Sequence, residues 1–313
     1  RDLRTGPVPV ARFYTRATSA VSGVHVRISP FDQRVVDIRF FDSEGMNLDK
    51  HEERNVERVF FREDFRRSYM DGIGTISYAA DAIPLYNQAF LASVDQEAIR
   101  GAGFNIVVDY AFATTSQVLS DIFQALQVST TPLGARVDPA YISLEQDIFQ
   151  DELRRMAIIV NALGSDFGVR LDVGGEKIFL ADDRGQLVPD VLACAAMVEL
   201  ALRSKPGGVV AVPVNLSSVF ERIAREHRGS ILRTPVDLAS LMQAAHNADV
   251  LMAADGAGAF VFPEFQPVAD GMMAVARLLQ MLAQQRMHLS ELIDSLPPFH
   301  VVSTTVECSW ENK

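Results

Sequence analysis

The chain has 313 residues, 48% of them hydrophobic and 22% charged, which is enough for two or three domains of ordinary size. Acidic residues outnumber basic ones by 40 to 29, and the formal charge of -11 argues against nucleic acid or an anionic membrane as a partner. No stretch approaches the roughly 18 to 20 apolar residues of a membrane span. Two cysteines make no disulfide framework and no signal peptide opens the chain, so we expect a cytoplasmic protein.

The first hundred residues predict a helix, a pair of strands and further helices. A proline-rich approach leads into apolar residues at helical spacing, and two alternating segments beside a proline-containing loop are typical of strands. A charged helix broken into two parts and an amphipathic helix follow. These elements are expected over residues 1–21, 24–28, 35–41, 48–70 and 83–94.

From residue 101 the pattern changes to alternating strands and helices. The apolar run 104–110 is typical of a buried strand, and it enters a loop of small residues that leads into a helix. Similar units recur on both sides of the linker 204–208, and the apolar run 296–302 predicts a last strand. Helices are expected near 118–126, 144–162, 190–203, 217–227, 236–246 and 269–285, and strands near 209–214, 230–233 and 249–253. This order predicts an α/β fold.

A hairpin at residues 167–184 combines two apolar runs with acidic residues at its bend. The first run ends on Asp172, and the pair Gly174-Gly175 permits a tight backbone path, so that Asp172 and Glu176 can face one point. Paired carboxylates beside a glycine bend suit a hard divalent cation, but they also suit a solvent-exposed hairpin. The residues by themselves leave both interpretations open.

These blocks, in this order, resemble the α-D-phosphohexomutase family of phosphoglucomutases and phosphomannomutases. The resemblance is carried by RISPFDQRVVDIRFFDSEG (27–45), FFREDFRRSYMDGIG (60–74), NIVVDYAFATTS (105–116), LGSDFGVRLDVGGEKIFLADDRG (163–185) and ADGAGAFVFPEFQPVADGMMA (254–274). It implies three consecutive α/β/α domains around a central cleft, at 1–98, 99–204 and 205–295, with 296–313 leading toward a fourth domain that is absent here. The likeness is greatest to the mutase-like C-terminal module of bacterial proteins that begin with a mannose-1-phosphate guanylyltransferase.

The resemblance implies a serine that carries the phosphoryl group. The family's motif is Thr-x-Ser-His-Asn-Pro, and Ser29 falls on the serine but is followed by Pro30, Phe31 and Asp32. Without the resemblance, Ser29 is a turn serine before a proline. The expected nucleophile therefore lacks its usual neighbours.

The hairpin bend takes the place of the family's magnesium loop, Asp-Gly-Asp-x-Asp-Arg. Asp172 and Glu176 match the first and third aspartates as metal ligands, and Lys177 takes the place of the arginine as a catalytic cation. Gly174 stands where the second aspartate is expected. Mg²⁺ is therefore the implied cofactor, but only two of its three carboxylate ligands are present.

The third loop of the family, Gly-Glu-x-Ser-Gly, recognises sugar hydroxyls. Asp255 stands at the glutamate, and Ala257 replaces the serine and cannot form a hydrogen bond through its side chain. Arginines near residue 66 suit a phosphate, although an exposed charged helix explains them as well. The expected substrate-binding residues are Asp255, Gly256, Gly258 and Arg66.

Two functions follow from the resemblance. One is an active Mg²⁺-dependent mutase that interconverts hexose 1- and 6-phosphates through phosphorylated Ser29. The other is a weakened or inactive module that binds a hexose phosphate or supports assembly of a nucleotidyltransferase domain on the same chain, as a homo-oligomer. We favour the second because all three loops have lost members, and the loss of one charge-stabilising group already costs about a hundredfold in rate.

Overall fold

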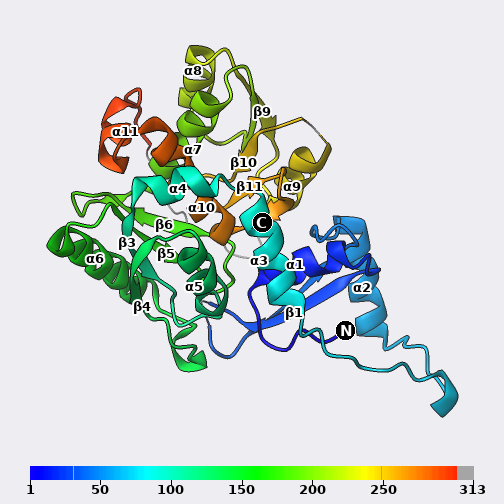
Figure 1. Cartoon of the computed structure of the whole chain (residues 1–313). Helices are drawn as coiled ribbons and strands as arrows, with labels where there is room; N and C mark the ends of the chain where they lie inside the picture. The colour runs from blue at the N-terminus through cyan, green and yellow to red at the C-terminus, as the bar shows by residue number, and fades with distance from the viewer. Residues whose placement is uncertain (31, 248, 302–313) are drawn as a thin grey trace.

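The structure is a computed structural model that describes residues 1–30, 32–247 and 249–301. Its N-terminal region places helices beside a two-stranded antiparallel sheet, in which Val26 lies opposite Ile38 (Figure 1). The elements of this region are α1 (Val8–Ala17), β1 (Gly23–Ile28), β2 (Val36–Phe41), α2 (Lys50–Arg62), the 3₁₀ turn η1 (Met70–Gly72), α3 (Ala82–Ala92) and α4 (Gln96–Ala102).

The middle region is built on a mixed five-stranded sheet of order β4-β3-β5-β6-β7. Strand β3 is parallel to β4 and β5, and β6 returns antiparallel to β5. Its elements are β3 (Asn105–Asp109), α5 (Ser116–Ala125), β4 (Ser129–Leu133), η2 (Pro139–Tyr141), α6 (Gln146–Leu163), β5 (Phe167–Leu171), β6 (Ile178–Ala181), β7 (Leu187–Val188) and α7 (Asp190–Ser204).

The C-terminal region has a second mixed sheet of order β12-β11-β10-β8-β9. Its elements are β8 (Val209–Pro213), α8 (Val219–Glu226), β9 (Ser230–Thr234), α9 (Leu238–Asn247), β10 (Met252–Ala254), β11 (Phe260–Phe262), β12 (Gln266–Ala269), α10 (Gly271–Gln285) and α11 (Leu289–Ser295). The predicted α/β fold is confirmed, with most helices and strands within a few residues of their expected places.

Helix α10 joins the three regions into one core. It is buried almost all round and packs on α4, α7, β5, β6 and β11. One hydrophobic cluster runs without a break from Phe13 of α1 through Ile106 of β3 to Val210 of β8. The loops between these regions are therefore fixed relative to one another by apolar packing.

Three local predictions were wrong. The first helix ends at Ala17, and Val21 beyond it is 91% exposed. The charged helix ends at Arg62, where Glu63 adopts a left-handed conformation (φ 52°), and the expected second part is an exposed arm, residues 63–77 (Figure 1). Residues 296–301 form no strand. In the arm, the apolar side chains find too little surface to bury against, and helix stability comes mostly from such packing. In the tail, Pro297 and Pro298 have no backbone N–H to donate to a neighbouring strand.

The sheet of β1 and β2 presents its polar face to the rest of the molecule. Val26, Ile38 and Phe40 point outward and are exposed, whereas Arg27 and Arg39 alternate with them and point inward. This alternation brings two cations toward the loop between β5 and β6. No described helix combines the length and apolarity that a membrane crossing requires.

Candidate functional site

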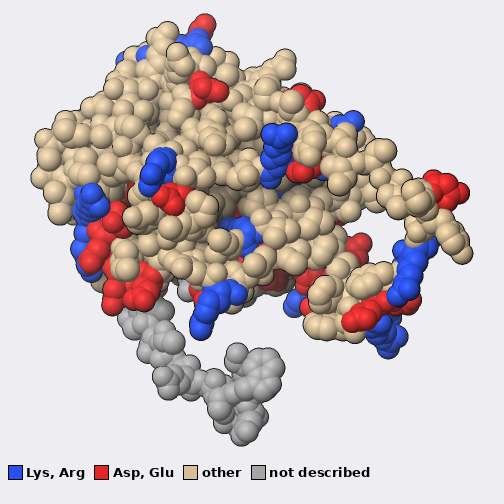
Figure 2. Space-filling view, turned by 90° about the horizontal axis from the view of Figure 1, so that it is seen from below, with Lys and Arg blue, Asp and Glu red and all other residues tan. Residues whose placement is uncertain are grey.

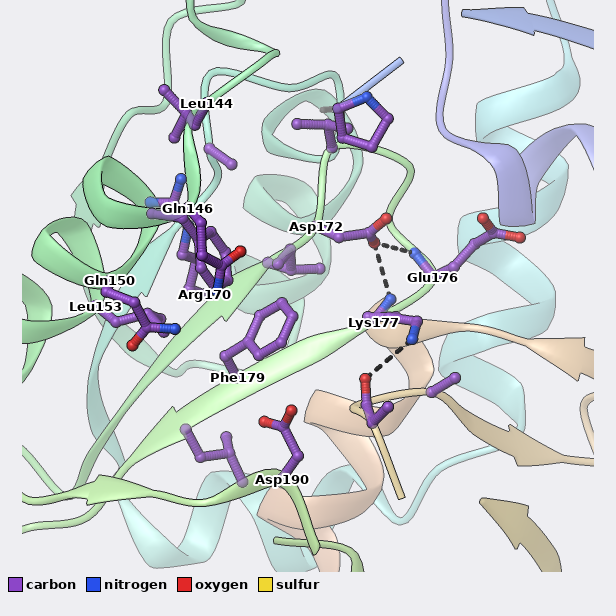
Figure 3. A pocket seen from close by; sticks show the side chains of 18 of the residues that line it. Leu144, Gln146, Gln150, Leu153, Arg170, Asp172, Glu176, Lys177, Phe179 and Asp190 are labelled. Atoms are coloured by element: carbon purple, nitrogen blue, oxygen red, sulfur yellow. Dashed lines mark hydrogen bonds between the residues drawn. The ribbon is translucent and has the colours of Figure 1, made fainter. Parts of the chain in front are cut away.

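A cavity of about 720 Å³ lies where the three regions meet. The β1–β2 sheet contributes Arg27 and Arg39, and the loop after β10 contributes Ala257. The loop after β5 contributes Asp172, Val173, Glu176 and Lys177. The opposite wall is largely apolar, and Phe179 projects from β6 toward the middle of the cavity (Figure 3). This wall also contains Leu144, Phe149, Leu153, Leu187 and Val188.

Asp172 uses its carboxylate to hold the bend together. Its Oδ1 accepts hydrogen bonds from the backbone amides of Glu176 (2.6 Å) and Lys177 (2.8 Å), and its Oδ2 accepts one from Gly174 (3.1 Å) (Figure 3). Burial raises the pKa of Asp172, and the nearby charge of Glu176 raises it further. The bend therefore depends on Asp172 as a backbone cap.

Glu176 points away from the cavity, toward α1 and the β1–β2 sheet (Figure 3). Its Oε1 lies 3.3 Å from Arg12 Nη2, and its Oε2 accepts a short hydrogen bond from Arg39. Arg12 is buried and also donates to Gly45 O and Asn47 Oδ1, both at 2.7 Å. Both oxygens of Glu176 are thus engaged by guanidinium groups, which form strong charge-assisted hydrogen bonds.

Lys177 connects the second loop to the third. Its Nζ lies 3.1 Å from Asp255 Oδ2 and 3.0 Å from Ala257 O. Asp255 Oδ1 meanwhile accepts hydrogen bonds from the amides of Ala257 (2.7 Å) and Ala259 (2.9 Å). Asp255 and Lys177 therefore lie together beside the cavity, as expected for loops that share one site.

The glycines of the third loop serve its backbone. Gly256 and Gly258 have φ values of +74° and +94°, and a Cβ on Gly258 would lie 2.8 Å from Ile178 O. The amide of Ile178 donates to Gly258 O at 3.0 Å, so the two loops pair directly. Only glycine fits this close approach without strain.

Ser29 and Arg66 are not brought into the cavity. Ser29 is 7% exposed, and its neighbour Pro30 lines the cavity whereas Ser29 does not. Ser29 O accepts a hydrogen bond from the hydroxyl of Ser143. Arg66 lies on the exposed arm, 63–77, away from the residues that line the cavity (Figure 1). On the face in Figure 2, the basic side chains of the described residues are interspersed with acidic ones.

Sequence reasoning missed the arginines that surround the bend, Arg12, Arg27 and Arg39. A signal for them was present, because Arg27 and Arg39 alternate with apolar residues in both strands, and Arg12 interrupts the apolar face of α1. A second buried pair, Arg170 with Asp109, was also missed; it joins β5 to β3 below the cavity.

The residues present do not fit a magnesium site of the family type. The oxygens of Asp172 accept three backbone amides, those of Glu176 face two arginines, and Gly174 offers no side chain. Within the described residues, no group of three His, Cys, Asp or Glu side chains could hold a metal ion. Mg²⁺ prefers near-octahedral oxygen coordination, which this set does not offer.

Two family models match the chain. The model "Phosphoglucomutase/phosphomannomutase, alpha/beta/alpha domain I" matches residues 2–67, and the domain III model matches residues 189–299. A phosphoglucomutase/phosphomannomutase of Thermococcus kodakarensis is 27% identical over 303 residues, which are 97% of this chain and 66% of that protein. A probable phosphoglucosamine mutase of Methanopyrus kandleri is 25% identical over 100% of this chain and 68% of that protein. The chain thus spans about two thirds of the length of these relatives.

Solved structures share the fold. A putative phosphomannomutase from Thermus thermophilus superimposes with a TM-score of 0.82 at 16% identity, over 93% of this chain and 66% of that one. An Aspergillus fumigatus N-acetylphosphoglucosamine mutase, in complex with GlcNAc-6P and magnesium, gives a TM-score of 0.60 at 13% identity, over 92% of this chain and 75% of that one. With both domain models of one family matched and relatives aligned over nearly all of its length, the chain belongs to the phosphoglucomutase/phosphomannomutase family, the α-D-phosphohexomutases.

Proposed function

We propose that this chain is a phosphohexomutase-fold module that binds a hexose phosphate in the cavity and has lost most or all of the family's phosphoryl transfer. The observation that carries this proposal is the capture of Glu176 by Arg12 and Arg39. Transfer of a phosphoryl group between anions needs a cation beside the group that moves. Glu176, expected as a ligand of that cation, is instead neutralised by the protein itself.

The position of Ser29 supports the same proposal. A phosphoryl carrier has to reach the substrate, whereas Ser29 is buried outside the cavity lining. The family's histidine and asparagine after the serine are replaced by Pro30 and Phe31. A proline here supplies neither a side-chain donor nor a backbone N–H.

The binding half of the proposal rests on the shape and charge of the cavity. Its volume of about 720 Å³ falls in the ordinary range for small-molecule sites. Arg39 and Lys177 supply positive charge at one side, and their side chains are 31% and 36% exposed. These cations suit the phosphate of a hexose phosphate, and Asp255, beside the cavity, holds Lys177 through their 3.1 Å contact.

Isothermal titration calorimetry with glucose 1-phosphate, mannose 1-phosphate and glucosamine 6-phosphate tests binding. Lys177→Met should weaken binding by about tenfold, because it removes one charge from the phosphate side. Arg34→Ala is the matched control, since Arg34 is an exposed cation that pairs with Asp32 outside the cavity. The absence of saturable binding for all three ligands would contradict this half of the proposal.

A coupled mutase assay with Mg²⁺ and a hexose bisphosphate tests the other half. We expect no turnover above the background of Ser29→Ala. Turnover that Ser29→Ala abolishes would establish the alternative, an active phosphohexomutase that uses Ser29 as its phosphoryl carrier.

The predicted partner domain is a separate proposal. A sugar-1-phosphate nucleotidyltransferase on the same chain would use the class of ligand that this module binds. Addition of mannose 1-phosphate and GTP to the full-length protein should then release pyrophosphate. The sequence of the whole reading frame decides whether such a domain exists.

A further inference from the structure

Arg27 lies among the charged residues around the 172–177 loop. It projects inward from β1 with 11% of its side chain exposed; its Nε is 3.5 Å from Asp37 Oδ2, and its Nη1 is 3.8 Å from Asp172 Oδ2. Both nitrogens are shielded from solvent, and neither has a hydrogen-bond acceptor among the described residues. Arg27 is therefore held by packing and charge attraction, as a cation embedded between carboxylates.

Gly174 leaves open the space that Arg27 fills. A Cβ built on Gly174 would overlap Arg27 Nη1, and it would lie 3.1 Å from Asp172 Oδ2 and 3.3 Å from Glu176 Oε2. The backbone does not require glycine here, because the left-handed conformation of the bend belongs to Gly175 (φ +76°). A side chain at position 174 and the guanidinium of Arg27 thus exclude each other.

We propose that the Arg27 guanidinium is the resident cation of the 172–177 loop and takes the place that a divalent metal ion would need there. Gly174 stands at a ligand position of the family's magnesium loop, and Arg27 stands where the serine motif has threonine. The two changes complement each other, since one removes a negative charge and the other adds a positive one. Arg12 and Arg39 hold the remaining carboxylate, Glu176, so that an entering metal ion meets three guanidinium groups of like charge.

The arrangement also indicates the class of ligand, and this half of the inference rests on the proposed function. The cavity's positive charge is supplied by side chains, so the module should bind a phosphate monoester in the absence of any divalent ion. The metal half of the inference concerns the loop alone and does not depend on which ligand the cavity takes.

Manganese provides the direct test, because Mn²⁺ that binds to a protein loses its sharp free-ion signal in electron paramagnetic resonance. The 313-residue chain should show no saturable site. The double variant Arg27→Ser/Gly174→Asp should gain one site per chain and bind Mn²⁺ at least about tenfold more tightly. A wild-type site that Glu176→Gln removes would overturn the proposal, and so would a double variant that binds Mn²⁺ no better than the wild type.

Thermal unfolding of the same variants measures the mutual exclusion of the two side chains. Gly174→Asp alone should lower Tm, and Arg27→Ser should restore part of the loss in that background, so the effects are not additive. Gly74→Asp is the matched control, because a Cβ at Gly74 meets nothing within 4 Å. Arg27→Lys keeps the charge and should remain folded without binding Mn²⁺. Additive losses in the double variant would contradict the proposal.

Calorimetry with glucose 1-phosphate in EDTA and in Mg²⁺ tests the ligand half. The affinities measured in EDTA and in Mg²⁺ should agree within about twofold. Binding about tenfold weaker in EDTA than in Mg²⁺ would overturn the ligand half of the inference. Absence of binding in both buffers would refute the proposed function, whereas the Mn²⁺ titration would still decide the role of Arg27.

Discussion

The hairpin of β5 and β6 is followed closely by a second bend, and the two bends share one local design. In the first, Gly175 N donates to Asp172 O at 3.0 Å; in the second, Gly185 N donates to Asp182 O at 2.9 Å. Both glycines are left-handed, with φ values of +76° and +71°, and both aspartates accept backbone amides of the following residues. The backbone of an Asp-x-x-Gly bend is thus the same whether or not the family uses the loop for chemistry.

The surroundings of the two bends are what differ. The first faces Arg12, Arg27 and Arg39, which come from distant parts of the chain. The second faces α11, where Asp183 accepts hydrogen bonds from the amide (2.9 Å) and hydroxyl (2.8 Å) of Ser290. An aspartate in such a bend is thus first a backbone cap, and the residues around it decide any further role.

The largest contrast between the bends should come from removing a carboxylate at each. Glu176→Ala leaves Arg12 buried without its charge partner and should lower the free energy of unfolding by about 4 kcal/mol. Asp183→Ala loses hydrogen bonds at a partly exposed position and should cost about 1 kcal/mol. Urea denaturation measures both variants; equal losses would show that the arginines add nothing to the first bend.

The residues that pack against the first bend should make the stability of the protein depend on pH. Gly271 N donates to Gly175 O at 2.9 Å, and the preceding residue, Asp270, is buried, which raises its pKa to about 6. Because this pKa is above its ordinary value of 3.8, the contribution of Asp270 to stability is present below pH 4 and is lost as pH rises to about 6. Across this pH range, the contribution of Asp270 to the free energy of unfolding should fall by about 3 kcal/mol. Urea denaturation between these pH values should show this slope in the wild type and a much weaker one in Asp270→Asn.

Replacing a glycine in each bend by alanine should produce a smaller difference in stability. Gly185→Ala places a Cβ 2.6 Å from Ala157 O in a left-handed backbone, which should cost about 2 kcal/mol or more. Gly174→Ala meets only the ends of side chains, with Arg27 nearest and Asp172 Oδ2 and Glu176 Oε2 at 3.1 and 3.3 Å, and should cost about 1 kcal/mol. The loss from Gly174→Ala should shrink in an Arg27→Ala background, whereas the loss from Gly185→Ala should not. Differential scanning calorimetry of the two glycine variants, of Arg27→Ala and of the two double variants makes the comparison.

The smallest expected effect is a difference between Asp172 and Asp183 in the sign of their contribution to the pH dependence of stability. Burial and the charge of Glu176 raise the pKa of Asp172, so its contribution to stability falls as pH rises. Burial also acts to raise the pKa of Asp183, but the hydrogen bonds from Ser290 outweigh it and lower that pKa, so this contribution is lost as pH falls. Asp172→Asn and Asp183→Asn should therefore change the pH slope of stability in opposite directions below about pH 5. Slopes of the same sign would contradict the assigned environments.

Much of the fold was predictable from local sequence signals. Buried strands such as 105–109 are nearly continuous apolar runs, and helices such as α6 and α10 show apolar residues at helical spacing. The charged stretch after Arg62 was predicted wrongly because helix formation there would require a packing partner that its apolar residues do not find. Each bend was also predictable, since aspartate and glycine favour it through contacts within a few residues.

The α/β order and the bends could therefore be inferred from the residues alone, because they depend on periodicity and on short-range backbone geometry, and the family could be inferred from its motifs. The role of the acidic bend could not, because it depends on residues that are distant in the chain. Arg12 and Arg39 lie 164 and 137 positions from Glu176, and no local pattern states that they and Arg27 converge on one loop. Their long side chains reach it because α1 and the β1–β2 sheet pack against the middle region, and the resulting charge balance at Glu176 is a property of that packing.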